Sequence, residues 1–282
     1  MISGRFATAQ GSSDKPNEDW VGMSASAVVV LDGLSSGPGP AQAEGTGAAC
    51  VHGTPWFVAQ LGARLLAFCA NETKSLALCL REAISAVVEL HSETCDVLSP
   101  NAPTATVAVV RIASTGDRVE YLVLADAAII IGGPNGEATV LTDERVEAVA
   151  KEQKEAVLRA QIGTPEHDAA IAELISIQKP LRNSSHGYWV AGADPNVADE
   201  AISGQLVLRP GDSIAAVTDG VSRLVDLFGK ATWAGLLSRL SSDGPDAILA
   251  QVRELEMNDP VGKRWPRYKM SDDATAAVLS IS

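Results

Sequence analysis

The chain has 282 residues, of which 46% are hydrophobic and 20% charged, and its formal net charge is -13. This length and apolar content suit one large domain with a sizeable core. The acidic balance excludes the general attraction to phosphates that underlies most nucleic-acid binding, and also attraction to an anionic membrane surface. Without a secretion signal or an apolar stretch long enough to span a membrane, we expect a cytoplasmic protein whose four cysteines are reduced.

Runs of β-branched residues bounded by turn residues predict strands. They lie at 27–33, 104–112, 119–126, 128–133, 138–143, 205–208, 213–217 and 273–282. Apolar residues at helical spacing predict helices at about 55–70, 74–95, 143–161, 230–241 and 244–257. Because helices and strands are segregated rather than alternating, the order indicates an α+β fold in one domain over 1–282. A Gly/Pro-rich loop is predicted at 35–47, and the polar stretch at about 160–187 is predicted to be a flap over the site.

Acidic residues recur where predicted strands begin or end. Asp32-Gly33 and Asp219-Gly220 each close an apolar run, Glu18-Asp19 precedes another, and Asp272-Asp273 opens the last strand. A single Asp-Gly is more often a turn than a ligand, but four acidic sites against β-runs favour a common function. Carboxylates and a carbonyl are hard oxygen ligands for Mg²⁺ or Mn²⁺, and two such ions can activate a water for phosphoryl displacement.

The chain resembles the metal-dependent type 2C (PPM) protein phosphatases, particularly their bacterial members. The motifs that carry the resemblance, in order, are NEDW (17–20), VVVLDG (28–33), PTATVAVV (103–110), YLVLAD (121–126), RPGDSIAAVTDGV (209–221) and SDDATAAVLSI (271–281). The resemblance implies a four-layer β-sandwich of mainly antiparallel strands flanked by helix pairs. It also implies two Mg²⁺ or Mn²⁺ ions at one end of the sheets.

The resemblance also implies a role for each acid. Asp32 would bridge both ions and Gly33 would bind one through its carbonyl, while Asp219 and Asp272 would hold the first ion. Around the second ion, Asp19 would hold waters, with Glu18 behind it. Asp126 is a further possible metal-site acid, and Asp273 replaces Asp272 if the register is shifted by one residue.

Arg223 stands where the family has an acid for a third ion, so two ions are expected. The family's phosphate-binding Arg is replaced by Asp14, with Lys15 beside it, and Lys lacks the bidentate fork of Arg. Arg223 is therefore predicted to pair with Asp14 or to bind the anionic substrate, or else to be a surface residue. One basic cluster, Lys263, Arg264, Arg267 and Lys269, is either a solvated loop or a surface that receives an anionic substrate.

The His that many family members carry after the first Asp-Gly is absent here. His52 is a candidate leaving-group acid at the start of a helix, and Cys50 is a weaker candidate thiolate. The alternative makes Cys50 a small buried residue and His52 a polar helix-start residue. His91, His167 and His186 are expected to be solvated.

The predicted function is hydrolysis of phosphomonoesters with metal-activated water. Phosphoserine or phosphothreonine in proteins is the first substrate class, and a small phosphorylated metabolite is the second. The alternatives are a catalytically weakened module that binds and regulates a phosphorylated partner, and a structural protein whose acids bind cations for stability. The oligomeric state and the choice between Mg²⁺ and Mn²⁺ stay open.

Overall fold

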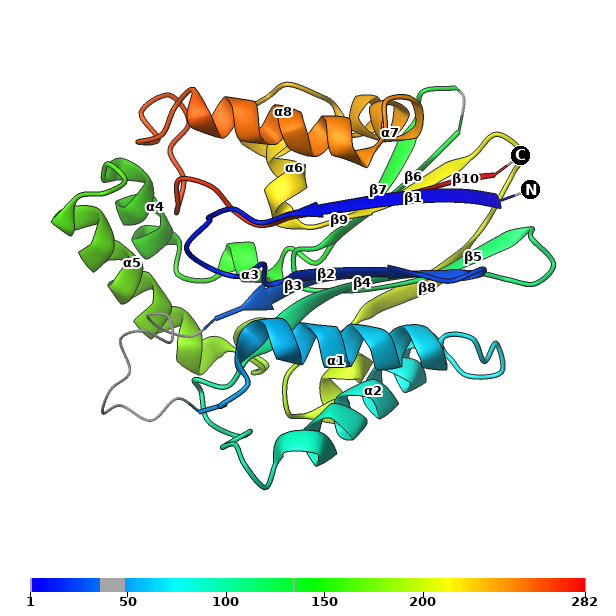
Figure 1. The fold of residues 1–282 in the computed structure, drawn as a ribbon, viewed down its shortest axis with the longest axis horizontal. Helices are drawn as coiled ribbons and strands as arrows, with labels where there is room; N and C mark the ends of the chain where they lie inside the picture. Colours follow the sequence, from blue (N-terminus) through cyan, green and yellow to red (C-terminus); the bar gives the residue numbers. More distant parts are fainter. Residues whose placement is uncertain (1, 36–48, 134, 282) are drawn as a thin grey trace.

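The fold consists of two five-stranded antiparallel sheets packed face to face. A computed structural model describes residues 2–35, 49–133 and 135–281 (Figure 1). The first sheet has the order β1 (Ile2–Ala9), β10 (Ala274–Ile281), β9 (Ser213–Val217), β6 (Ala128–Gly132) and β7 (Ala138–Leu141). The second has the order β2 (Asp19–Met23), β3 (Ala27–Leu34), β4 (Thr104–Ile112), β5 (Arg118–Leu124) and β8 (Ile202–Val207).

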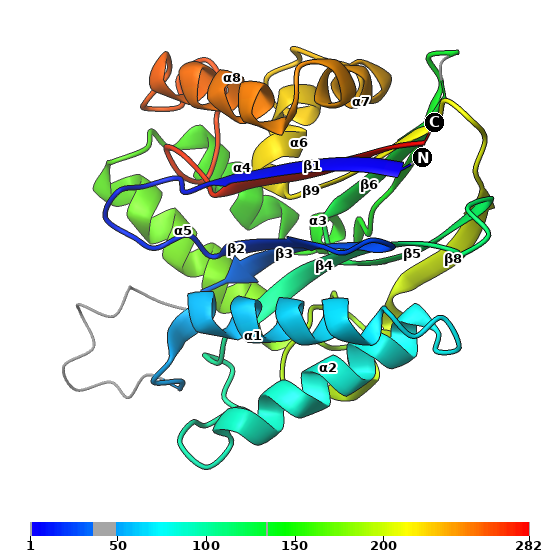
Figure 2. The same cartoon turned by 45° about the vertical axis from the view of Figure 1, so that its right-hand side comes forward.

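Helices cover the outer face of each sheet, which gives four layers (Figures 1 and 2). On the second sheet lie α1 (Gly53–Phe68) and α2 (Leu76–His91); on the first lie α6 (Asp219–Asp226), α7 (Trp233–Ser242) and α8 (Pro245–Met257). In β3, Val28 and Val30 pack between the sheets, whereas Val29 and Leu31 pack against the helices. Successive strand residues point to opposite faces, so a strand buried on both faces reads as a continuous apolar run. The predicted α+β sandwich with flanking helix pairs is confirmed.

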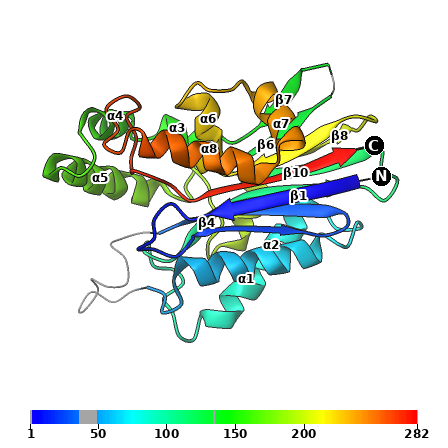
Figure 3. The ribbon, with the colours of Figure 1, turned by 45° about the horizontal axis from the view of Figure 1, so that its top comes forward.

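A further group of helices lies at one end of the sandwich, away from the termini (Figures 1 and 3). It contains α3 (Arg145–Ala148), α4 (Lys151–Arg159), α5 (Pro165–Gln178) and the short 3₁₀ segment η2 (Lys179–Leu181); a second 3₁₀ segment, η3 (Pro195–Glu200), packs on α2. The single helix predicted over 143–161 is wrong, because the chain breaks at Ala150, where φ is 53°.

The prediction of an irregular loop at about 160–187 is also wrong, because α5 occupies most of it. The Thr164 side chain accepts a hydrogen bond from the His167 N–H, and Pro165 takes the first helical position, a common way to start a helix. Its role as a flap stays a prediction. The predicted loop at 35–47 lies, apart from Ser35, outside the described residues.

The predicted turn between 205–208 and 213–217 connects the two sheets. β8 pairs with β5 in the second sheet, and β9 pairs with β6 and β10 in the first. Gly211 adopts a φ of 91°, and the Asp212 carboxylate accepts the Arg209 N–H at 2.7 Å. In the described part of the chain, no helix has the length and apolar character needed to cross a bilayer.

Candidate metal and phosphate site

Four aspartates from distant parts of the chain meet at one end of the sandwich. Asp19 and Asp32 are paired in register across β2 and β3. Asp32 also forms a side-chain hydrogen bond with Asp219, which begins α6 directly after β9. Asp272 lies two residues before β10. The Arg223 guanidinium pairs with both Asp272 and Asp219. The structure therefore brings the proposed ligands together.

A threonine ties the two sheets together at this site. The Thr218 hydroxyl donates to Asp19 Oδ2 at 2.9 Å, and the Thr218 N–H donates to the Thr275 carbonyl at 3.0 Å. The first contact joins the end of β9 to the start of β2, and the second joins it to β10. Thr218 thus fixes the position of one proposed ligand, Asp19, relative to the next, Asp219.

Both Asp-Gly pairs need glycine because backbone from another segment passes close by. The Gly33 N–H donates to the Glu18 carbonyl oxygen at 3.0 Å, and a Cβ at Gly33 would lie 2.5 Å from that oxygen. A Cβ at Gly220 would lie 2.0 Å from the Asp273 carbonyl oxygen. Packing between segments, besides any ligand, therefore accounts for these glycines.

The aspartates perturb one another strongly. Burial, followed by the charges of Asp19, Asp219 and Asp272, raises the pKa of Asp32 well above its usual value. Burial raises the pKa of Asp19 to about 8, and burial together with Asp219 raises that of Asp126 to about 7. Such shifts mark a concentration of negative charge in a poorly solvated place, which a cation would relieve.

Asp19 has one carboxylate oxygen that is buried without a hydrogen-bond partner, Oδ1. The residue as a whole is only 7% exposed. An unpaired buried carboxylate oxygen is costly, and a divalent cation satisfies it. Asp19 and its strand neighbour Asp32 therefore fit a Mg²⁺ or Mn²⁺ ion.

Asp272 and Asp219, by contrast, are already held by cations of the protein. Arg223 Nη2 contacts Asp272 Oδ2 and lies 3.5 Å from Asp219 Oδ2, while Lys269 Nζ contacts Asp272 Oδ1. Burial raises the pKa of Asp272, but the charges of Arg223 and Lys269 outweigh burial, so the pKa falls below its usual value. No group of three or more His, Cys, Asp or Glu side chains within the described ranges is arranged to hold an ion. Asp219 and Asp272 thus have protein cations at the position where an ion would bind, whereas Asp19 Oδ1 has no partner.

The predicted pairing of Arg223 with Asp14 is wrong. Asp14 is exposed and contacts Ser12 and Ser13, whereas Arg223 is 8% exposed and points into the carboxylates. The reading of Arg223 as a surface residue is wrong as well. The sequence suggested the pair because the two residues carry opposite charges. In the structure, the partners of Arg223 are Asp219 on its own helix, Glu256 on α8 and Asp272 just before β10.

Asp273 has a structural role that occupies both of its oxygens. Oδ1 accepts the Gly11 N–H and Oδ2 accepts the Glu18 N–H, each at 2.7 Å. These contacts hold the turn between β1 and β2, so Asp273 is not favoured as the substitute ligand. Burial raises the pKa of Glu18, whose carboxylate accepts the Ser35 hydroxyl.

The other candidate residues lie around the start of α1. The His52 ring stacks on Trp56 at 4.3 Å between centroids and meets His91 edge-on at 6.3 Å. Cys50 is buried, and its Sγ is 3.3 Å from that of Cys95.

Two of the three histidines that we expected to be solvated are buried. His91 and His167 are each 4% exposed, and His91 Nδ1 lies 2.7 Å from the Val87 carbonyl oxygen. His186 is exposed, as expected.

Sequence reasoning missed three residues of the site: Thr218, Glu256 and Lys269. Lys269 was seen only as part of the basic cluster, although its position three residues before Asp272 was a usable signal. The cluster does not form one surface, because Arg267 is buried and its Nη1 lies 3.3 Å from Asp259 Oδ2. Glu256 gave no signal, because a fully buried carboxylate within an amphipathic helix looks like any other polar position.

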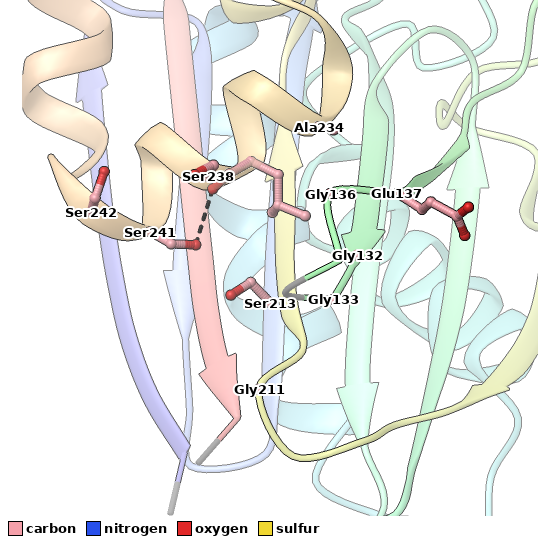
Figure 4. A pocket seen from close by; sticks show the side chains of 11 residues that line it. Gly132, Gly133, Gly136, Glu137, Gly211, Ser213, Ala234, Ser238, Ser241 and Ser242 are labelled. Atoms are coloured by element: carbon pink, nitrogen blue, oxygen red, sulfur yellow. Dashed lines mark hydrogen bonds between the residues drawn. The ribbon is translucent and has the colours of Figure 1, made fainter.

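A separate pocket of about 370 Å³ lies at the opposite end of β9 (Figure 4). Its lining includes Gly132, Gly211, Ser213 and Ser238, and none of the clustered aspartates. Ser213 starts β9, whereas Asp219 follows its other end, so the pocket is separate from the carboxylates.

Comparisons with known proteins agree with the fold. A family model described as protein phosphatase 2C matches residues 8–252. The structure of the Mycobacterium tuberculosis serine/threonine phosphatase PstP/Ppp is similar, with a TM-score of 0.61 and 17% identity over 100% of this chain and 99% of that one. The S. agalactiae serine/threonine phosphatase gives a TM-score of 0.57 and 16% identity over 100% of both chains. PppA of Pseudomonas aeruginosa gives 0.56 and 14% over 100% of this chain and 98% of that one.

A search of curated proteins found no match. The solved structures share the fold at low identity, and the family model spans most of the sequence. This chain therefore belongs to the protein phosphatase 2C family.

Proposed function

We propose that this protein hydrolyses phosphomonoesters, with phosphoserine and phosphothreonine of proteins as its first substrate class. The proposal rests mainly on Asp19, a buried carboxylate with one unpartnered oxygen in a cluster of aspartates at one end of the sandwich. Membership of the protein phosphatase 2C family supports the reaction class. A small phosphorylated metabolite is the alternative substrate class.

Asp19, Asp32 and the Gly33 carbonyl are the groups that would hold Mg²⁺ or Mn²⁺. When bound, such an ion lowers the pKa of a ligated water and supplies the nucleophile. Thr218 orients Asp19 through its hydroxyl. The resemblance implies a second ion on Asp219 and Asp272, where Arg223 and Lys269 now lie.

Two residues are proposed to handle the substrate. Lys15 is exposed and close enough to Glu18 to lower the pKa of that carboxyl against the effect of burial, so we assign it to the phosphate. His52 is exposed at the start of α1 and is proposed to protonate the leaving group. Arg223 does not contact the substrate in this proposal; it pairs with the carboxylates of Asp219 and Asp272.

One observation favours a second function, a regulatory module that binds a phosphorylated partner. Arg223 and Lys269 contact Asp272 directly, and a metal ion at that carboxylate would have to displace them. A domain that had lost a working metal centre while keeping its fold would show such a contact.

Hydrolysis of p-nitrophenyl phosphate and of a phosphothreonine peptide, with and without Mn²⁺, separates these functions. Turnover that needs Mn²⁺ and is lost in both Asp19→Ala and Asp32→Ala supports the phosphatase. Asp243→Ala, which removes an exposed carboxylate directly after α7, is the matched control and should retain full activity. Absence of turnover together with tight phosphopeptide binding would favour the regulatory module.

A further inference from the structure

We propose that Arg223 and Lys269 replace one divalent ion, so that this chain binds a single Mg²⁺ or Mn²⁺, at Asp19 and Asp32. The inference rests on the proposed function and specifies its metal requirement. A similar structure, the catalytic domain of PstP, is described in complex with two manganese ions; it has a TM-score of 0.59 and 18% identity over 99% of this chain and 98% of that one. In the present chain, an arginine and a lysine contact one of the clustered carboxylates directly.

The Arg223 guanidinium lies among three carboxylates from three segments. It contacts Asp272, lies 3.5 Å from Asp219 one helical turn earlier on α6, and lies 3.5 Å from Glu256 on α8. Arginine stays protonated in proteins and presents several donors in a fixed plane. Its positive charge therefore occupies the space between Asp219 and Asp272 permanently.

Glu256 Oε1 forms an ion pair with Arg223 Nη1 at 3.5 Å, and that nitrogen makes no hydrogen bond. The Glu256 side chain is fully buried, bonds Arg253 at 2.6 Å and accepts the Asp272 N–H at 3.4 Å. Moving Arg223 away would remove one of the charges that neutralise a buried carboxylate, which is unfavourable. A metal ion bound to Asp219 and Asp272 would therefore have to displace the Arg223 guanidinium, which is also paired with Glu256.

Lys269 completes the charge balance. Its Nζ contacts the other oxygen of Asp272, so both oxygens of this carboxylate are paired with protein cations. Arg223 and Lys269 together supply two positive charges, the same as one divalent ion. The part of the cluster that lacks such compensation is Asp19, whose Oδ1 has no partner.

Binding of Mn²⁺ to the full chain tests this inference without measuring activity. Isothermal titration calorimetry should give one equivalent per chain, and electron paramagnetic resonance should give the spectrum of an isolated ion. In Arg223→Met, which removes the charge without adding a ligand, the count should rise from one to two equivalents, and an exchange-coupled spectrum should appear. If Arg223→Met does not fold, Lys269→Met, a change at a more exposed side chain, should give a second equivalent that wild type lacks.

Two control variants test whether the number of bound ions depends on the charge at position 223 or on the net charge of the protein. Arg223→Lys keeps the positive charge and should keep one equivalent. Arg239→Met makes the same change on α7, where Arg239 pairs with exposed Asp243 at 3.5 Å, and should also keep one equivalent.

The possible failures are distinguishable. Two coupled ions in the wild-type chain would overturn this inference and leave the phosphatase proposal standing. No bound ion in the wild-type chain would overturn both. One ion in the wild type and still one in folded Arg223→Met and Lys269→Met would show that these side chains do not replace the other ion.

Discussion

Replacing Asp19 with asparagine is expected to stabilise the metal-free protein at alkaline pH. The amide remains neutral, can accept the Thr218 hydroxyl bond, and leaves no charged oxygen at the position where Oδ1 lacks a partner. The wild-type carboxylate must ionise in a buried place, which is unfavourable without a cation.

The size of the effect follows from the pKa of Asp19. Burial raises this pKa from its usual value of 3.8 to about 8. At about 1.4 kcal/mol per pH unit, the ionised form is disfavoured by at most about 6 kcal/mol. Because the neighbouring acids titrate together, we expect asparagine to recover a part of this, about 2–3 kcal/mol.

The pH dependence has a definite sign. A carboxyl whose pKa is raised in the folded state binds more protons there than in the unfolded chain, so its stabilising contribution is complete below about pH 4 and lost as pH rises to about 8. Wild-type stability without metal should therefore fall across this range more steeply than that of Asp19→Asn. Near pH 5 the two proteins should differ by less than about 1 kcal/mol.

Urea unfolding in EDTA at pH 5 and pH 9 measures both differences, with Asp243→Asn as an exposed control. Adding Mn²⁺ should reverse the order at pH 9, because only the wild-type carboxylate binds the ion well. An Asp19→Asn protein that is no more stable than wild type at pH 9 in EDTA would refute the reasoning.

Further predictions concern the backbone around the site and the cysteines. Asp273→Ala should lower the unfolding free energy by about 3 kcal/mol, because it removes the charged acceptor of two backbone N–H groups. Asp273→Asn should cost about half as much, and a urea midpoint unchanged in both variants would contradict the assigned role. Gly220→Ala should cost at least about 3 kcal/mol by the same assay, because its Cβ would lie 2.0 Å from a carbonyl oxygen. Hydrogen peroxide should oxidise the Cys50 and Cys95 thiols, 3.3 Å apart, to a disulfide while being reduced to water. Intact mass should fall by two hydrogens, and Cys95→Ser should abolish that loss.

Much of the sandwich could be predicted because its strands are buried on both faces. The runs at 104–112 and 213–217 coincide with β4 and β9, and the Asp-Gly pairs lie at strand ends as expected. β1 gave no comparable signal, because most of its described side chains are exposed at a sheet edge. Its pairing with β10 is visible only in three dimensions.

The sequence did not predict α5 or the ion pairs of Arg223, for two different reasons. α5 carried a recognisable start in Thr164-Pro165, but Ala and Ile distributed around the helix obscured the apolar stripe. The partners of Arg223 could not be predicted, because Asp272 is 49 residues away and the choice among many acids depends on how α6 and α8 pack. A local charge pattern does not contain that information.

The pairing of β1 with β10 has a consequence for how the chain folds. Ala9 is aligned with Ala274 and Ile2 with Ile281, so this edge of the first sheet forms only when segments separated by most of the polypeptide meet (Figure 3). Closing so large a loop is entropically expensive and slows folding. During synthesis, β1 must therefore wait until β10 has been made, and the carboxylates just before β10 can join the others only then.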